Sequence, residues 1–437
     1  MSDYLIIIHI LNAVLSGKNL TETFTANIGK IATADINTRV GIKTRADKDL
    51  AYTQINIGKI KDICYGVVRN YYRLQAVLSQ IVSRTPEDKN LQILLLIGVY
   101  ELEYTKKAPY AAVNELVNLS LELSTNQRVK NFINGVMRSY LREREQLHQQ
   151  AAAQPEYKYN FPHWLIHKLK QEYPNKYSQL IENSNSIPKI ALRVNLSKIS
   201  FDDYVKILNN AAIDFDLIEN KIVLKLLLKV EQIPFFQDGY VSIQDISAQR
   251  LIELVKPQKG DYILDACCAP GGKMCQILEH SQVKLLGLDI SKTRLNKVKQ
   301  NLVRLGLSAD LIEADASKCD WWQACDSPLF DTIIADVPCS ASGTLKRNPD
   351  IKLNRRLLDI DNFVILQRKI VSNLWQMLKP GGKMVYITCS IFKEENHDNI
   401  EFFSQRLSDV LVIREFNILP TPFADGFYYC VLEKSIN

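Results

Sequence analysis

The chain has 437 residues, of which 46% are hydrophobic and 23% charged, and its formal net charge is +6 at neutral pH. This length predicts two or three domains, and the composition is normal for a soluble globular protein. Residues 1–146 hold 19 Lys and Arg against 14 Asp and Glu, a mild excess that suits a polyanionic partner or simply a solvated surface. The apolar stretch 5–15 is too short to span a bilayer and no basic segment precedes it, so we expect a core helix and no membrane partner.

The cysteines exclude two common roles. Their number is odd, their spacing is irregular, and no pair of C-x2-C knuckles occurs, so neither a disulfide framework nor a zinc site is indicated. Reduced thiols in a cytoplasmic protein without a bound metal are expected instead. The nine positions are Cys64, Cys267, Cys268, Cys275, Cys319, Cys325, Cys339, Cys389 and Cys430.

Residues 1–145 show helical periodicity throughout. Apolar residues recur at intervals of three and four, as at Leu5, Ile8, Leu11 and Leu15, and no strand-like alternation is present. The stretch 91–100 is almost entirely apolar, which indicates a helix in the centre of a bundle. We predict an all-α domain over 1–145.

A polar stretch of low complexity follows this domain. It predicts a linker over 146–158, and a small α+β connecting region is expected over 159–237. Residues 191–195 and 221–230 are expected to be strands, and 201–210 a helix. Arg193 and Asn195 either contact RNA or complete a strand edge, and the sequence alone leaves both open.

The remaining residues, 238–437, alternate between strand and helix. The apolar run 262–264 predicts a buried strand, Gly271 and Gly272 a tight turn, and 274–278 the first turns of a helix. Further strands are expected at 284–289, 310–315, 330–336, 384–388 and 427–432, with a helix at 365–378. This order predicts an α/β domain with a Rossmann-like parallel sheet.

Four acidic residues stand at or near the carboxyl ends of successive predicted strands: Asp265, Asp289, Asp315 and Asp336. Ligands of open α/β sheets bind along that edge. One such Asp is usually a helix cap, whereas four in succession favour a ligand site. The turn lacks both the G-x-G-x-x-G pattern of dinucleotide sites and the G-x-x-x-x-G-K-[ST] pattern of a P-loop.

Three motifs in this domain resemble a known family. They are DACCAPGGK at 265–273, DVPCS at 336–340, and TCS at 388–390 followed by EEN at 394–396. Together they are similar to the RNA cytosine-C5 methyltransferases that use S-adenosylmethionine, whose catalytic domain has the class I methyltransferase sheet. Cys268 and Val337 stand where alanine is usual, and we expect these small side chains to preserve the turn.

The N-terminal domain carries a second resemblance. CYGVVR at 64–69, AVNE at 112–115 and FINGVMR at 132–138 are similar to the RNA-binding fold of the Nus-B antitermination factor. With this domain in front, the chain is most similar to the bacterial 16S ribosomal RNA enzymes of the Sun/Fmu type, which act at a cytosine-967 type site. Positive side chains available for phosphate contacts are Lys59, Lys61, Arg69, Arg73, Lys106, Lys107 and Arg128.

The resemblance implies the cofactor S-adenosyl-L-methionine and assigns its contacts. The turn would surround the methionine end, Asp289 would hold the ribose, Asp315 the adenine amino group, and Asp336 would lie near the transferred methyl. The turn residues concerned are Cys267, Cys268, Ala269, Pro270, Gly271, Gly272 and Lys273.

The resemblance also implies catalytic roles. A thiolate that adds to C6 of cytosine makes C5 nucleophilic enough to attack a sulfonium methyl. By the family's pattern Cys389 is this nucleophile, Cys339 assists release of the product, and Asp336 contacts N3 of the base. Spacing alone does not choose between the two cysteines, and the Pro-Cys dipeptide of DNA cytosine-C5 methyltransferases keeps Cys339 as the rival nucleophile.

The expected substrate is 16S ribosomal RNA, in the small subunit or an assembly intermediate, with the target base unstacked. Lys346, Arg347 and Lys352 either hold the RNA backbone or are plain loop charges. The protein is expected to be a cytoplasmic monomer. Two alternatives remain: a transfer RNA cytosine-C5 methyltransferase, and a non-catalytic RNA-binding assembly factor that kept the fold.

Overall fold

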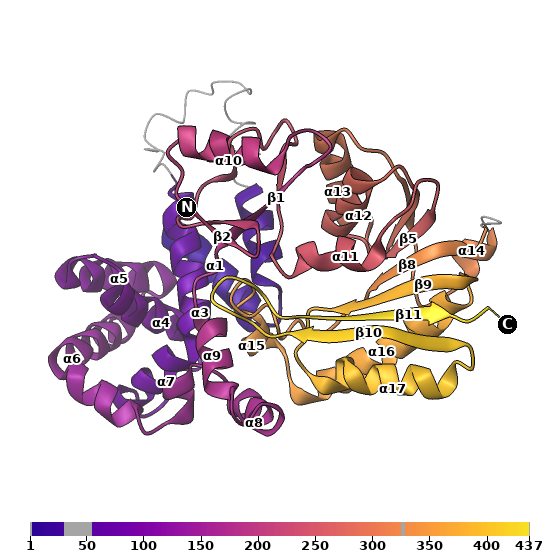
Figure 1. The fold of residues 1–437 in the computed structure, drawn as a ribbon. Coiled ribbons are helices and arrows are strands. Elements are labelled where there is room, and N and C mark those ends of the chain that lie inside the picture. The colour runs from indigo at the N-terminus through magenta and orange to yellow at the C-terminus, as the bar shows by residue number, and fades with distance from the viewer. Residues whose placement is uncertain (1, 30–54, 325–327, 437) are drawn as a thin grey trace. The chain divides into compact units, whose positions relative to one another are not determined.

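A computed structural model describes residues 2–29, 55–324 and 328–436 (Figure 1). The chain divides into two compact units. The first comprises the residues up to Asn185 together with 348–355, and the second comprises 186–347 together with 356–437. No helix in the described part of the chain is long and apolar enough to cross a membrane.

The first unit is a helical bundle, which confirms the predicted all-α fold. Helix α4 contains the apolar run and is buried along most of its length, with Leu94, Ile97 and Val99 all at 0% exposure, because it packs against α1, α3 and α5. The helices are α1 (Asp3–Leu15), α3 (Ile57–Ile81), α4 (Lys89–Tyr104), α5 (Pro109–Leu123), α6 (Gln127–Ala151), α7 (Pro155–Tyr159), α8 (His163–Glu172), α9 (Tyr177–Asn185) and α15 (Ile351–Asn354).

The stretch expected to be a linker is largely helical. Helix α6 continues to Ala151, and Leu147 and Ala151 are buried in the core of the bundle. Alanine and glutamine are good helix formers, so a polar, alanine-rich stretch can form a long helix with one buried stripe. Residues 159–185 are predicted to belong to the connecting region, but in the structure they contribute α8 and α9 to the first unit.

The second unit begins with a small antiparallel sheet in the order β2-β3-β1-β4. The predicted strand over 221–230 ends at Leu224, and Leu226 and Leu227 beyond it are exposed, so the apolar run there is not a strand. The elements are β1 (Ile190–Val194), α10 (Phe201–Asn210), β2 (Phe215–Ile218), β3 (Lys221–Leu224), the 3-10 turn η1 (Val230–Gln232) and β4 (Val241–Ile243).

The larger sheet has seven strands in the order β10-β11-β9-β8-β5-β6-β7. Strands β7, β6, β5, β8 and β9 are parallel, and β11 runs antiparallel between β9 and β10. The elements are η2 (Ala248–Arg250), α11 (Leu251–Val255), β5 (Tyr262–Ala266), α12 (Gly272–His280), β6 (Lys284–Asp289), α13 (Lys292–Leu305), β7 (Asp310–Glu313), α14 (Asp320–Ala324), β8 (Phe330–Asp336), α16 (Leu357–Trp375), β9 (Leu378–Thr388), η3 (Lys393–Glu395), α17 (His397–Arg406), β10 (Val410–Ile418) and β11 (Phe427–Lys434).

Alternate side chains of the central strands enter two cores, one on each face of the sheet. Ile263 packs with residues of α11, α12 and α13, whereas Leu264 packs with residues of α16 and α17. Strands β6 and β7 lie on one side of β5, whereas β8 and β9 lie on the other side, so the strand order reverses at β5. Such a switch point opens a crevice at the carboxyl ends of β5 and β8.

Candidate active site

The turn after β5 has a backbone that calls for glycine. Gly271 has φ +98°, and its N–H donates to the carbonyl of Cys268 at 2.8 Å. A Cβ at Gly271 would lie 3.1 Å from the side chain of Val298, which adds a steric reason for glycine. Helix α12 begins at the next residue, so its N-terminus faces the turn.

Asp289 braces this turn from β6. It is 1% exposed, and its Oδ2 accepts the backbone N–H of Ala269 at 3.2 Å while its Oδ1 accepts that of Ser291 at 3.0 Å. Arg294 donates to the carbonyl of Ala269 at 2.8 Å and lies 3.5 Å from Asp289. The Arg294 contact cannot be predicted from the sequence, in which the arginine looks like an exposed charge on α13.

Asp265 is the least satisfied acid of the site. It is fully buried, and neither carboxylate oxygen accepts a hydrogen bond of normal geometry. Burial, followed by the charge of Asp336, raises the pKa of Asp265 to about 8, and the opposing ammonium of Lys273 does not cancel the rise. A buried acid without a donor fits a cationic ligand, and S-adenosylmethionine carries both an ammonium and a sulfonium group.

Lys273 of α12 pairs with Asp336 at the end of β8, with Nζ 2.5 Å from Oδ2. Burial works against the charged amine, but the carboxylate of Asp336 outweighs it and raises the pKa of Lys273. Asp315 lies just beyond β7 and accepts the N–H of Ser317 at 2.9 Å. Burial opposes its ionised form, but the hydrogen bonds from Ser317 prevail and lower the pKa of Asp315. The four predicted acids therefore lie at or near the carboxyl ends of four adjacent strands, β7, β6, β5 and β8.

The two cysteines singled out in the sequence meet in the structure. Cys339 follows β8 and Cys389 follows β9, and their Sγ atoms are 3.3 Å apart. Cys339 is buried and Cys389 is half-buried. The hydrogen bond with Cys389, followed by burial, raises the pKa of Cys339 well above its ordinary value, so Cys339 is a neutral thiol at neutral pH.

The other described cysteines lie away from this pair or within the turn. Cys64, Cys275 and Cys430 are buried, and burial raises the pKa of each thiol, as expected for small core residues. Cys319 is half-buried. Cys325 lies outside the described residues. Among the residues that the structure describes, no group of three or more His, Cys, Asp and Glu could hold a metal ion.

The positive residues Lys346, Arg347 and Lys352, which follow Cys339, form bonds within the protein, and both lysines are buried. Lys346 is 1% exposed and donates to the carbonyls of Thr421 at 2.6 Å and Ala424 at 2.5 Å. Arg347 pairs with Asp245 at 2.8 Å and Asp425 at 2.5 Å.

Lys352 belongs to the first unit. Its Nζ donates to the carbonyls of Arg69 at 2.6 Å and Asn160 at 2.9 Å, and to the side chain of Asn185 at 3.1 Å. The sequence leaves these three residues open between RNA contacts and plain loop charges, and in the structure each of them bonds to other groups of the protein, which their charge pattern did not reveal.

Arg193 and Asn195 also act within the protein. Arg193 is 6% exposed and forms a paired contact with Glu279, at 2.8 and 3.0 Å, while its Nη1 donates to the carbonyl of Gly272 at 2.9 Å. Asn195 is 1% exposed and donates to the carbonyl of Gly239 at 3.0 Å. Arg193 thereby ties the small sheet to the beginning of α12.

The positive residues proposed for the N-terminal unit divide into two sets. Lys59 and Lys107 both pair with Glu115, and Lys107 also pairs with Glu101 at 3.2 Å. Arg69 and Arg73 are half-buried. The exposed set consists of Lys61, Lys106 and Arg128. These three are the ones with side chains open to a polyanion.

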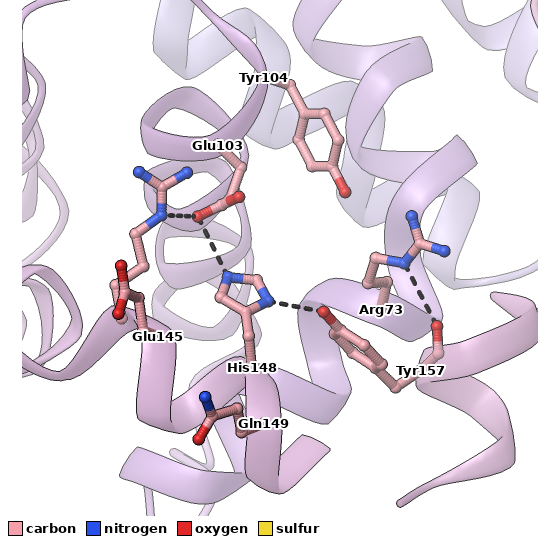
Figure 2. Close-up of a pocket in the computed structure, with 8 residues that line it drawn as sticks. Arg73, Glu103, Tyr104, Glu145, His148, Gln149 and Tyr157 are labelled. Carbon is pink, nitrogen blue, oxygen red and sulfur yellow. Dashed lines mark hydrogen bonds and ion pairs between the residues drawn. The ribbon is translucent and has the colours of Figure 1, made fainter. Parts of the chain in front are cut away.

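A hollow of about 460 Å³ in the same unit has polar walls (Figure 2). Glu103 accepts from Arg144 at 2.6 Å and lies 3.2 Å from the ring of His148, whose other nitrogen lies 2.8 Å from the hydroxyl of Tyr157. Arg73 donates to the carbonyl of Tyr157 at 3.2 Å. The carboxylate of Glu103 is thus paired with Arg144 within the unit.

A seven-stranded sheet of this order, with acids along the ends of its parallel strands and a glycine turn after β5, defines the class of S-adenosylmethionine-dependent methyltransferases. Three family models match the chain: 16S rRNA methyltransferase RsmB/F at residues 252–426, the NusB family at 8–142, and the RsmF/B-like ferredoxin-like domain at 161–230. The chain is 38% identical to the ribosomal RNA small subunit methyltransferase B of Vibrio cholerae, over 86% of this chain and 89% of the relative. It is also 38% identical to that of Yersinia enterocolitica, over 90% and 92%. The chain belongs to the 16S rRNA methyltransferase RsmB/F family, and it is an S-adenosylmethionine-dependent RNA methyltransferase.

Solved structures share the fold. The crystal structure of PH0851 covers 98% of both chains with a TM-score of 0.75 and 21% identity. A methyltransferase homologue from Pyrococcus horikoshii covers 64% of this chain and 97% of its own, with a TM-score of 0.56 and 24% identity. At these identities the likeness establishes architecture only.

Proposed function

We propose that the chain methylates C5 of a cytosine in 16S ribosomal RNA, at a site of the cytosine-967 type, through a covalent bond between Cys389 and C6 of the base. The observation that carries this proposal is the pair of thiols 3.3 Å apart at the strand ends, beside the Lys273–Asp336 ion pair. One base seated there would lie within reach of two thiols and a carboxylate. This is the set of groups that addition at C6, proton removal at C5 and contact at N3 require.

The two thiols differ in a way that favours Cys389 as the nucleophile. Cys389 is half-buried and so more accessible to a base, whereas Cys339 is buried. The Cys389 thiolate adds to C6, so that the Sγ–C6 bond forms as the C5=C6 double bond opens. After methylation a base removes the C5 proton, the Sγ–C6 bond breaks, and Cys339 assists this release.

The residues proposed to hold the cofactor lie along the same edge. When bound, S-adenosylmethionine supplies an electrophilic methyl group. Asp265 offers two buried acceptors to a cationic ligand, and Asp289 orders the turn through Ala269. Besides Asp265, the proposed cofactor contacts are Cys267, Cys268, Ala269, Pro270, Gly271, Gly272, Lys273, Asp289, Asp315 and Asp336.

We propose a substrate in the small subunit or one of its assembly intermediates, and a cytoplasmic monomer as the acting form. The names of the relatives and the match to the NusB family support ribosomal RNA over transfer RNA. Exposed Lys61, Lys106 and Arg128 provide phosphate contacts in the N-terminal unit.

The experiment is to incubate the purified chain with labelled S-adenosylmethionine and RNA from a bacterium lacking this modification, both naked and as small-subunit particles, and to map methylated cytosines. A single 16S position supports the proposal. Label confined to transfer RNA overturns the substrate, and absence of label on both forms despite cofactor binding favours the non-catalytic assembly factor.

A further inference from the structure

The carboxylate of Glu395 lies between the two turns that carry the cysteines. Glu395 belongs to η3 and has an exposure of 0%. Its Oε1 accepts the backbone N–H of Ser340 at 2.8 Å and the amide of Gln367 at 3.0 Å. Its Oε2 accepts the hydroxyls of Ser340 and Ser390, each at 2.5 Å. Four donors from three separate segments thus converge on one buried group.

Two of these segments are the cysteine turns themselves. Ser340 directly follows Cys339, and Ser390 directly follows Cys389. The same turns are joined by a backbone hydrogen bond, because the N–H of Gly343 donates to the carbonyl of Cys389 at 2.9 Å. A Cβ at Gly343 would lie 2.8 Å from that carbonyl oxygen, so this close approach depends on glycine.

The third segment anchors the carboxylate to the body of the unit. Gln367 of α16 also donates to the carbonyl of Pro338 at 2.9 Å, and the hydroxyl of Tyr386 in β9 donates to the backbone carbonyl of Glu395 at 2.6 Å. The side chain of Asn399 donates to Gln367 at 2.8 Å. Hydrogen bonds from α16, β9 and α17 therefore fix Glu395 on one side, and its carboxylate faces both turns on the other.

The chemistry of the contacts requires a carboxylate. An ionised carboxylate is an acceptor only and can take four hydrogen bonds at once, whereas a glutamine presents a single acceptor oxygen and an N–H group that would face other donors. Burying a charge costs several kcal/mol unless donors satisfy it, and hydrogen bonds from hydroxyls to a carboxylate are among the stronger ones.

We propose that Glu395 is a positioning residue that clamps the Cys339 turn to the Cys389 turn and thereby sets the distance between the two thiols. The effect of this clamp on methyl transfer rests on the proposed function, in which both thiols must reach one base. The clamp itself is a statement about geometry, and it holds whichever cysteine is the nucleophile. Glu395 acts through Ser340 and Ser390 and makes no contact with either sulfur in the described hydrogen bonds.

The test measures thiol proximity without catalysis. Dibromobimane becomes strongly fluorescent when both of its bromides are displaced by neighbouring thiolates, so its cross-linking of Cys339 to Cys389 in the cofactor-free chain reports their spacing. The Cys339→Ala chain gives the background. In Glu395→Gln we expect the cross-linking rate above background to fall about tenfold, because two of the four donors lose their acceptor. Methyl transfer should fall in kcat while KM for the cofactor stays near the wild-type value.

Glu401→Gln is the matched control, since it removes one acidic charge from an exposed position of α17 and should leave cross-linking and kcat unchanged. Where Glu395→Gln fails to fold, the Ser340→Ala, Ser390→Ala double variant keeps the buried charge and removes both hydroxyl donors, with the same expected loss. If either of these variants folds and still cross-links at the wild-type rate, the clamp is refuted. The two proposals can also fail separately. If Glu395→Gln cross-links slowly but the Cys389→Ala variant still methylates RNA, the clamp is supported and the proposed function is refuted.

Discussion

Cofactor affinity should depend steeply on pH through Asp265. Burial, followed by the charge of Asp336, raises the pKa of Asp265 to about 8, so its carboxyl is mostly protonated at neutral pH when no cation lies beside it. Because folding raises the pKa of this carboxyl, the folded protein loses stability as the pH rises from about 4, the pKa of the carboxyl in the unfolded chain, toward 8. A bound cation that pairs with the carboxylate reverses this loss.

The magnitude follows from the pKa. Each pH unit below about 8 adds about 1.4 kcal/mol to the free energy of deprotonating Asp265, so affinity for S-adenosylmethionine should rise about tenfold per unit. Between about pH 5.5 and 7 this gives a gain of about thirtyfold, with a plateau near 8. Between about pH 5.5 and 7 the ligand's own amine stays mostly protonated, because α-amino groups titrate at about 7.7 to 8.0.

The assay is equilibrium dialysis with labelled S-adenosylmethionine at constant ionic strength. Asp265→Asn should bind weakly and show no rise with pH. Asp315→Asn is the matched control: the hydrogen bonds from Ser317 lower the pKa of Asp315, so its loss should weaken binding without changing the slope. A flat wild-type profile, or an unchanged slope in Asp265→Asn, would refute the reasoning.

Other substitutions probe the thiols and the ion pairs. Cys389→Ala should abolish methyl transfer with nearly unchanged cofactor affinity, and retained turnover would exclude it as nucleophile. Cys339→Ala should accumulate a covalent protein–RNA adduct, which migrates slowly in denaturing gel electrophoresis. Absence of this adduct would show that Cys339 plays no part in release. Lys273→Met keeps the volume but leaves the Asp336 carboxylate unpaired, so kcat should fall about 100-fold, and a wild-type kcat would contradict the pairing. Arg193→Met leaves Glu279 buried and unpaired and should lower unfolding free energy by about 3–5 kcal/mol, whereas an unchanged denaturation midpoint would argue against that bond.

The sequence predicted the parts of the fold that depend on local pattern. Apolar runs located the strands of the parallel sheet, and an acid at the end of each run located the ligand edge, because strand ends and side-chain alternation are properties of short segments. The strand β10 was missed since most of its residues are half-buried or exposed and it has no buried apolar run. Antiparallel pairing with β11 along its whole length forms it instead.

Contacts between distant segments could not be predicted in this way. The donors to Glu395 come from positions 340, 367 and 390, and no spacing rule connects them. The charges of Lys346 and Lys352 suggested exposure, yet both are buried, because carbonyl oxygens from distant segments satisfy the amines. The sequence position of Arg193 is compatible with an RNA contact or a strand edge, and only the ion pair with Glu279, far along the chain, shows that Arg193 acts within the protein.

The measurement that tests the central proposal most directly is to trap the chain on its RNA. Small-subunit RNA carrying 5-fluorocytosine at the target position cannot lose a C5 proton, so the covalent intermediate persists after methyl transfer. Digestion and mass spectrometry then identify the residue attached to C6. We predict attachment to Cys389. Attachment to Cys339 would exchange the two roles, and methyl transfer to cytosine without a trapped adduct would contradict covalent catalysis.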